Sequence, residues 1–291
     1  MSAARASGAG VTAGLTTLTM VCFAANSLLC RLALRSGSID AASFTEVRLL
    51  SAAAVMTLLA RSLGQSRKLG GTWLSAAALF AYALAFSISY LQIGAGIGAL
   101  VLFGAVQLTM IGWAIVRGER PGALEWLGLA LAIGGLVLLT RPGVSGSPVV
   151  GLVLMMVAGA SWGIYSLRGR GSADPLGTTA GNFVRTLPMV AVLVVVALAL
   201  QPAHATARGL ALAATSGGIT SGMGYALWYR VLRRLTGVQA ASVQLTVPVI
   251  AAAGGVALMG ERLTVRLVVA AALILGGIAL TILERTRPVR R

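Results

Sequence analysis

Long apolar stretches, separated by short polar breaks, follow one another along almost the whole chain. Each is close to the roughly 20 residues that a helix needs to cross the hydrocarbon core of a bilayer. Ten can be counted, at about 12–34, 41–60, 72–92, 95–116, 123–140, 149–167, 176–200, 207–229, 237–259 and 265–283. The pattern predicts an all-α integral membrane protein with ten transmembrane helices.

The breaks between these stretches are rich in glycine, proline and charged residues, which favour turns. The break between the third and fourth stretches is the weakest, because the run from Gln92 to Gly98 contains no charge. One long re-entrant segment in place of two helices is therefore an alternative at this point.

The overall composition supports a membrane protein. The 291 residues are 57% hydrophobic and 10% charged, with a mean hydropathy of +0.90, whereas about 25% of the residues of a soluble domain are charged. The first apolar run continues past Phe23 to Leu34 without a small-residue cleavage site, so we interpret it as an uncleaved first helix. Cys22 and Cys30 lie on that helix and are interpreted as packing residues.

The location of the basic residues accounts for the net charge of +16. If the N-terminus is cytoplasmic, fifteen of the 23 Lys and Arg residues fall on the cytoplasmic side and six on the other, while Arg48 and Arg185 fall inside apolar stretches. Membrane proteins carry such an excess in their cytoplasmic loops. We therefore expect both termini in the cytoplasm, the lipid bilayer as the partner of the basic surface, and no nucleic-acid partner.

A repeated charged motif divides the chain into two halves. The sequence from Gly118 to Arg120 is followed by Gly134-Gly135. The same pattern recurs 142 residues further along the chain, where the sequence from Gly260 to Arg262 is followed by Gly276-Gly277. Two units of five helices are predicted, at 1–142 and 143–291. Because five is odd, the second unit would cross the membrane inverted, an arrangement common among secondary transporters.

Further matches lie near the start of each half. Phe23 and Arg31 have the same spacing as Trp162 and Arg170, and the pair Val47-Arg48 matches the pair Val184-Arg185. The two arginines inside apolar stretches are therefore interpreted as counterparts.

On these residues the chain resembles the drug/metabolite transporter superfamily, and in particular its EamA-type exporters, over nearly its whole length. The resemblance also rests on Leu232 to Leu235, on Pro248 and on the two Gly-Glu-Arg motifs. The chain has Phe23 where the family usually has Trp, and Val106 where it often has Pro. The resemblance implies a bacterial inner-membrane carrier that works by alternating access around a central cavity, similar to exporters of amino acids, including the aromatic type.

The chemistry of an enzyme is not visible in the sequence. The one histidine, His204, lies in a predicted loop, and no aspartate lies in an apolar stretch, so neither a metal site nor a catalytic pair is expected. The glycines between Gly94 and Gly98 lack the Lys and Ser/Thr of a phosphate loop and are interpreted as helix packing. No cofactor and no obligate protein partner are predicted. An exporter of cationic drugs or sugar derivatives, a membrane scaffold and an intramembrane enzyme remain as alternatives.

Polar and aromatic residues inside the bilayer are costly unless they face a cavity or a partner, so they are the candidate substrate-binding residues. They are the amides Asn26, Gln107 and Gln244 and the aromatic residues Tyr82, Tyr90, Trp162 and Tyr165. Hydrogen bonds between helices are the alternative role for the amides. Trp73, Trp113 and Trp126 are interpreted as lipid-facing, and Tyr225, Trp228 and Tyr229 as residues of the cytoplasmic end of the eighth helix.

The intramembrane charges are candidates for gating or for structural pairing. They are Glu46, Arg48 and Arg185, with Pro248 as a candidate kink. A desolvated Glu46 could carry a proton, but pairing with Arg48 or Arg185 is the interpretation favoured here, and it implies facilitated diffusion or exchange. Glu119 and Glu261 are expected to form helix-end salt bridges.

Overall fold

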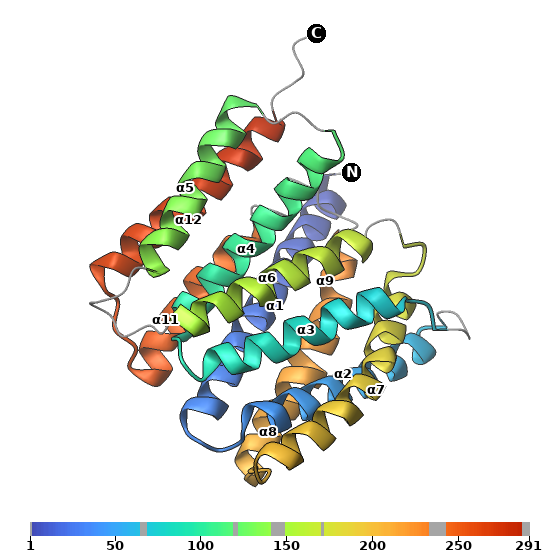
Figure 1. Ribbon diagram of the computed structural model, residues 1–291. Helices are drawn as coiled ribbons and strands as arrows, with labels where there is room; N and C mark the ends of the chain where they lie inside the picture. Colours follow the sequence, from blue (N-terminus) through green and yellow to red (C-terminus); the bar gives the residue numbers. More distant parts are fainter. Residues whose placement is uncertain are drawn as a thin grey trace.

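The computed structural model describes residues 2–64, 69–118, 122–140, 149–169, 172–232 and 243–286, with side chains given from 11 to 283 except at 229 and 232. Over these residues the chain forms helices joined by short connections (Figure 1). Their bounds are α1 Ser2–Arg35, α2 Ala41–Ser62, α3 Trp73–Tyr90, α4 Ala95–Val116, α5 Ala123–Thr140, α6 Val149–Gly169, α7 Pro175–Leu200, α8 Ala207–Thr215, the π-helix η1 Ser216–Met223, α9 Gly224–Leu232, α11 Thr246–Met259 and α12 Val265–Thr286.

The described helices confirm the predicted all-α membrane fold. Seven of them are long and apolar enough to span a bilayer, and α5 and α11 are shorter apolar helices. The helices α8, η1 and α9 follow one another without a break and together form the remaining predicted span. Because α3 and α4 are separate helices that each qualify as a span, the re-entrant alternative does not apply. Residues 237–242 of the predicted ninth stretch lie outside the described ranges.

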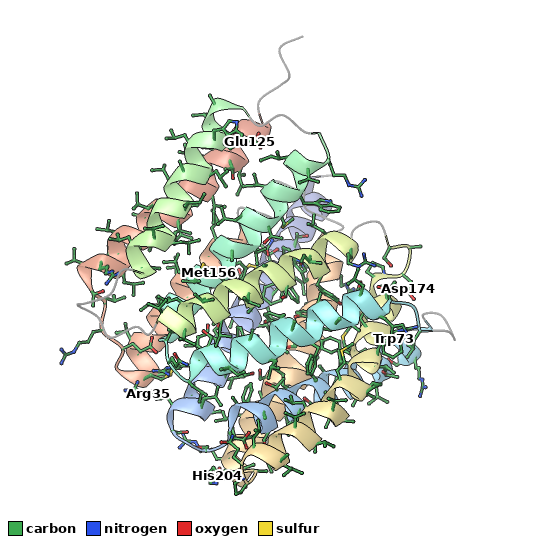
Figure 2. All side chains as sticks on the ribbon, viewed as in Figure 1. Arg35, Trp73, Glu125, Met156, Asp174 and His204 are labelled. Carbon is green, nitrogen blue, oxygen red and sulfur yellow. The ribbon has the colours of Figure 1, made fainter. Side chains whose placement is uncertain are left out.

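The helices run between two ends of the bundle, named here the Arg35 end and the Trp73 end. Figure 2 shows Arg35 and His204 at the first end, Trp73 and Asp174 at the second, and Met156 between them. Helix α1 begins, and α12 ends, on the same side as the Trp73 end (Figure 1). An even number of crossings brings both termini to one side in this way.

Side-chain caps mark where four of the helices begin. Asp40, Thr72, Asp174 and Thr206 each accept a hydrogen bond from the backbone N–H three residues later, at 2.8–3.2 Å. Such caps satisfy donors that the first helical turn leaves unpaired. Helix α4 begins differently, because its N-cap is Gly94, which has no side chain to accept a bond.

Helices α5 and α12 form a pair that lies beside the rest of the bundle (Figure 1). Their backbones come close at two places where a glycine lies opposite the other helix. A Cβ atom on Gly277 would lie 2.4 Å from the carbonyl oxygen of Gly128, and one on Gly135 would lie 3.0 Å from the carbonyl oxygen of Ala270. Adding 142 to the numbers 128 and 135 gives 270 and 277, so each contact becomes the other when the halves are exchanged.

Six of the helical stretches form one connected group in the interior of the bundle. Helix α6 packs on α3 and α4, α4 packs on α11, and α11 packs on α1. Helix α1 in turn contacts α8, η1 and α9, while α2 and α7 pack on each other at the side of this group. Trp73, Trp113 and Trp126 are exposed on the outside of the bundle, as expected for lipid-facing residues.

The close approach of α5 and α12 generates a stability prediction. Gly277→Ala would force a methyl group against the Gly128 backbone, and overpacking of this kind costs about 1–3 kcal/mol. The neighbouring Gly276 has nothing within 4 Å of its ideal Cβ position, so Gly276→Ala should be neutral or add about 0.5–1 kcal/mol through helix propensity. Thermal unfolding of the purified protein measures both; equal melting temperatures for the two variants would contradict the predicted crossing.

Candidate functional site

A hydrogen-bonded network of five side chains lies at the junction of α1, α2, α3 and η1. The amide nitrogen of Asn26 donates to the Tyr82 hydroxyl at 3.3 Å, and Arg48 Nη2 donates to the same hydroxyl at 2.9 Å. On the other side, Ser216 and Thr220 of η1 donate to Asn26 Oδ1 at 2.7 and 3.4 Å. These five residues, called the central polar network, join both halves of the chain and are all buried.

The π-helix η1 brings its hydroxyl groups to this network through a close approach to α2. A Cβ atom on Gly217 would lie 2.1 Å from the carbonyl oxygen of Arg48, so only glycine fits there. Gly218 and Gly222 face Val55 of α2, so these small residues also allow η1 to pack closely on α2. Short π-helical segments occur often at functional sites because they re-aim the side chains that follow.

Aromatic rings cover one side of the central polar network. The ring of Trp162 on α6 lies with its centroid 5.0 Å from that of Tyr82, 5.0 Å from that of Tyr225 and 5.4 Å from that of Tyr165. Tyr82 in turn contacts Phe86, with 5.4 Å between centroids. These five rings, called the aromatic cluster, come from α3, α6 and α9 and form an apolar surface next to a polar one.

Arg48 gives this site an unusual electrostatic character. Its side chain is only 2% exposed, and its guanidinium lies 5.1 Å from the centroid of the Tyr82 ring and 4.8 Å from that of Phe86. No carboxylate in the described part of the chain pairs with it, and Nη1 has no hydrogen-bond partner. A buried cation is costly unless it is paired, and ring faces compensate it only in part.

The predicted substrate-binding residues are only partly brought together. Asn26 and Tyr82 belong to the central polar network, and Trp162 and Tyr165 belong to the aromatic cluster, with the Tyr165 hydroxyl 3.4 Å from that of Thr179. Gln107 is half-buried on α4 and Gln244 is half-buried just before α11.

Tyr90 lies instead in a set of contacts between helix ends near the Arg35 end. Arg31 Nη1 donates to the Tyr90 carbonyl oxygen at 2.7 Å, and the fully buried Tyr90 ring packs so tightly on α4 that a Cβ at Gly98 would lie 2.3 Å from it. The Tyr90 hydroxyl donates to the carbonyl oxygen of Ala95 at 3.5 Å.

Glu261, just after α11, completes this set of contacts. Both of its carboxylate oxygens lie 2.9 Å from the backbone nitrogen of Ala95, and its Oε1 lies 3.6 Å from Arg31 Nε. The carboxylate therefore replaces the missing side-chain cap of α4, where the helix dipole favours an anion. Glu261 forms the predicted helix-end salt bridge, but its partner is Arg31 and not the neighbouring Arg262 beside which the bridge was expected. The corresponding prediction for Glu119 lies outside the described residues. Arg31, Tyr90, Ala95 and Glu261 are called the Arg31–Glu261 closure.

The predicted pairing of Glu46 with an arginine is wrong. Half-buried Glu46 and Arg48 are two positions apart on α2 and point in different directions. Arg185 donates to the carbonyl oxygens of Gly181 and Gly70, near the Trp73 end. Glu46 therefore gives no support for facilitated diffusion or exchange over proton coupling.

The two arginines also differ in their distance from their helix caps. Arg48 lies eight residues after the α2 cap Asp40, whereas Arg185 lies eleven residues after the α7 cap Asp174. The difference of three residues is nearly one helical turn. This offset accounts for their different partners, although the sequence match pairs them.

Pro248 is the third residue of α11 and lies three residues after the N-cap Leu245. Proline is tolerated in a first turn, where the N–H that it lacks would have no helical acceptor. The kink predicted for this position stays a prediction.

Sequence reasoning missed Tyr225, which it placed at the cytoplasmic end of the eighth helix. Tyr225 is buried and contacts Trp162 and Phe183. The π-helix before it shifts the direction of the residues that follow, and no pattern in the sequence reveals that shift. The sequence match between Phe23 and Trp162 could have indicated that Phe23 also lies in the interior. Phe23 contacts Tyr225 and Trp228 edge-on.

The chain is similar to a known transporter family and to several bacterial proteins. Residues 149–283 match the EamA-like transporter family, a range that begins with α6 and ends within α12. An uncharacterized protein of Pseudomonas aeruginosa is 49% identical over 276 residues, which cover 93% of this chain and 94% of its own length. A probable amino-acid metabolite efflux pump of Salmonella typhimurium is 26% identical over 65% of this chain and 67% of its own.

Two further similarities are more limited in what they show. The Escherichia coli inner membrane transporter YedA, itself uncharacterized, is 31% identical over 91 residues, which cover 31% of this chain and 29% of its own. A crystal structure that covers 96% of this chain and 99% of its own superposes with a TM-score of 0.67 at 18% identity, which shows a shared fold.

The membrane-spanning helices and the family match together show a multi-pass membrane transporter. The chain belongs to the EamA-like transporter family of the drug/metabolite transporter superfamily.

The Arg31–Glu261 closure can be tested with the native cysteines. Cys30 is fully buried beside Arg31. In a Cys22→Ala background, Glu261→Gln should speed the labelling of Cys30 by a membrane-impermeant maleimide about tenfold. The substitution removes a charge-assisted hydrogen bond, which contributes about 1.5–3 kcal/mol. A change of about 1.4 kcal/mol corresponds to a tenfold change in an equilibrium constant. Arg262→Gln, at an exposed neighbouring position, is the matched control. Labelling at the same rate in both variants would show that Glu261 does not hold this end closed.

Proposed function

We propose that this protein exports amino acids or similar small metabolites across the bacterial inner membrane by alternating access. The substrate would bind between the central polar network and the aromatic cluster. The observation that supports this most directly is the position of Asn26, Arg48 and Tyr82 beside Trp162 in the interior of the bundle. Groups that bind charge and groups that bind apolar surface then meet where a small amphiphilic molecule needs both.

The two halves, 1–142 and 143–291, are proposed as the units that move against each other. The exchange-related contacts of α5 and α12 support this division, as does the range of the family match, which covers the second half. In such a carrier the Arg31–Glu261 closure would be the gate at the Arg35 end, and its opening would admit the substrate site to that side. Sequence counterparts of its two charged residues are Arg170 and Glu119, which lie outside the described residues.

Export of amino acids is favoured over export of cationic drugs by the charge of the interior. Aromatic rings alone would suit an organic cation. However, the unpaired Arg48 guanidinium among these rings would repel a cation and attract an anionic or zwitterionic substrate. The name of the Salmonella relative, a probable amino-acid metabolite efflux pump, agrees with this choice.

The transport function can be tested by replacing one interior ring. Trp162→Ala should reduce counterflow of labelled amino acids in liposomes at least about tenfold, because the half-buried Trp162 ring would no longer contact the substrate, and a loss of about 1.4 kcal/mol of binding free energy corresponds to tenfold. Trp126→Ala is the matched control, since Trp126 is 52% exposed on α5. Retention of the wild-type rates by Trp162→Ala for every amino acid tested would rule out this binding site.

The arrangement in the membrane is also testable. The excess of basic residues in alternate loops predicts that both termini and the Trp73 end face the cytoplasm. Alkaline phosphatase fused after Arg291, which is active only in the periplasm, should stay inactive, while a fusion in the loop containing His204 should be active. The opposite pair of results would reverse the proposed orientation and place the Arg31–Glu261 closure on the cytoplasmic side.

A further inference from the structure

We infer that Arg48 binds the carboxylate of the transported molecule, so that the site selects small carboxylates with an apolar or aromatic side chain. This inference deepens the proposed function and rests on it for the transport step. It starts from a feature that the fold does not need: a guanidinium inside the bundle whose charge has no acidic partner among the described residues.

The contacts of Arg48 leave one edge of the guanidinium, at Nη1, for a ligand. Nη2 is used, because it donates to the Tyr82 hydroxyl at 2.9 Å. Nη1 is buried and has no hydrogen-bond partner. A planar guanidinium can donate two parallel bonds to a carboxylate, and a free donor next to an engaged one is suited to that geometry.

The surroundings hold Arg48 in place without neutralising it. Tyr82 is fixed by Asn26, which is fixed in turn by Ser216, so the acceptor that orients the guanidinium cannot swing away. The rings of Tyr82 and Phe86 lie near the charge but carry no formal negative charge. The anion that completes the site must therefore come from outside the described part of the protein.

A second buried polar atom without a partner lies on the neighbouring element. Ser221 Oγ of η1 makes no hydrogen bond in the described structure, and Gly217 of the same π-helix contacts the backbone of Arg48. Unsatisfied buried polar atoms are uncommon in folded proteins and often mark sites that a ligand completes. The aromatic cluster then supplies the apolar surface for the remainder of the same molecule.

Other charged groups do not provide this site. Arg185 donates to two backbone carbonyl oxygens, and Arg31 lies beside Glu261. Arg48 therefore differs from both, because it has neither a carboxylate nor a backbone acceptor within the described part of the chain.

The inference is tested by direct binding to the full-length protein in nanodiscs, in a chloride-free buffer. The probes are 3-phenylpropanoate, L-phenylalanine and L-phenylalaninamide, followed by tryptophan fluorescence and thermal unfolding. The two carboxylates should bind and raise the melting temperature, and the amide should bind at least about tenfold more weakly, because it cannot form the charge-assisted pair. Equal binding of the amide, or no binding of either carboxylate, would overturn the inference.

Substitutions separate an anchor from a structural charge. Arg48→Met should abolish the preference for carboxylate over amide while leaving the melting temperature of the ligand-free protein equal or higher, since an unpaired buried charge is removed. Arg48→Lys should bind the carboxylates more weakly but keep the preference. Arg185→Gln is the matched control and should keep wild-type discrimination. A lower melting temperature for Arg48→Met together with unchanged discrimination would show that Arg48 is structural.

Two further outcomes distinguish related explanations. If chloride alone gives the full stabilisation and carboxylates add nothing to it, the guanidinium binds an inorganic counter-ion and the inference is wrong. Counterflow in liposomes is measured in parallel. Carboxylate-selective binding without flux would reject the proposed transport and leave the anchor standing, whereas equal flux of phenylalanine and its amide would reject the anchor and leave transport standing.

Discussion

The hydrogen bond between Arg48 and Tyr82 is the interaction on which the interior of this protein depends. It holds a positive charge away from water inside a membrane bundle, where burial of an unpaired ion is costly. Asn26 donates to the same Tyr82 hydroxyl and accepts a hydrogen bond from Ser216, so the network connects α1, α2, α3 and η1. Evolution tolerates such an arrangement where the charge serves a function, and here the function proposed is the capture of an anionic group.

Two further sets of contacts position the helices around this interior. Glycines allow α5 and α12 to pack closely at the edge of the bundle, which leaves the remaining helices to surround the polar network. At the Arg35 end, Glu261 caps α4 and pairs with Arg31, so a single carboxylate connects three helix ends. In the proposed alternating-access mechanism, these few contacts are the ones that would break when this end opens.

Much of the fold could be predicted from the sequence. Apolar stretches of membrane-spanning length gave the helices, because a bilayer forces every crossing segment to satisfy its backbone internally. The Gly134-Gly135 and Gly276-Gly277 pairs indicated the repeat, whereas the crossing of α5 and α12 is known only from the structure. Trp162 and Tyr82 were candidates for interior residues because aromatic residues deep in a span need neighbours. These signals are local in the sequence and survive without knowledge of the tertiary contacts.

The partners of the charges could not be predicted in the same way. The choice of Arg31 by Glu261, and of Tyr82 by Arg48, depends on which helices lie side by side. The expected pairing of Glu46 failed for this reason, and Tyr225 was misplaced because the π-helix before it changes its direction. The spacing of residues along the sequence shows neither which faces of two helices meet nor where a π-helix forms.

The central claim is that the buried guanidinium of Arg48 receives the carboxylate of the transported molecule. The most direct measurement is a structure of the full-length protein in nanodiscs with L-phenylalanine bound. The account predicts a carboxylate oxygen within about 2.7–3.2 Å of Arg48 Nη1, the Arg48–Tyr82 hydrogen bond intact, and the ligand ring against Trp162. A ligand bound at any other place, with Arg48 Nη1 still unpartnered, would contradict it.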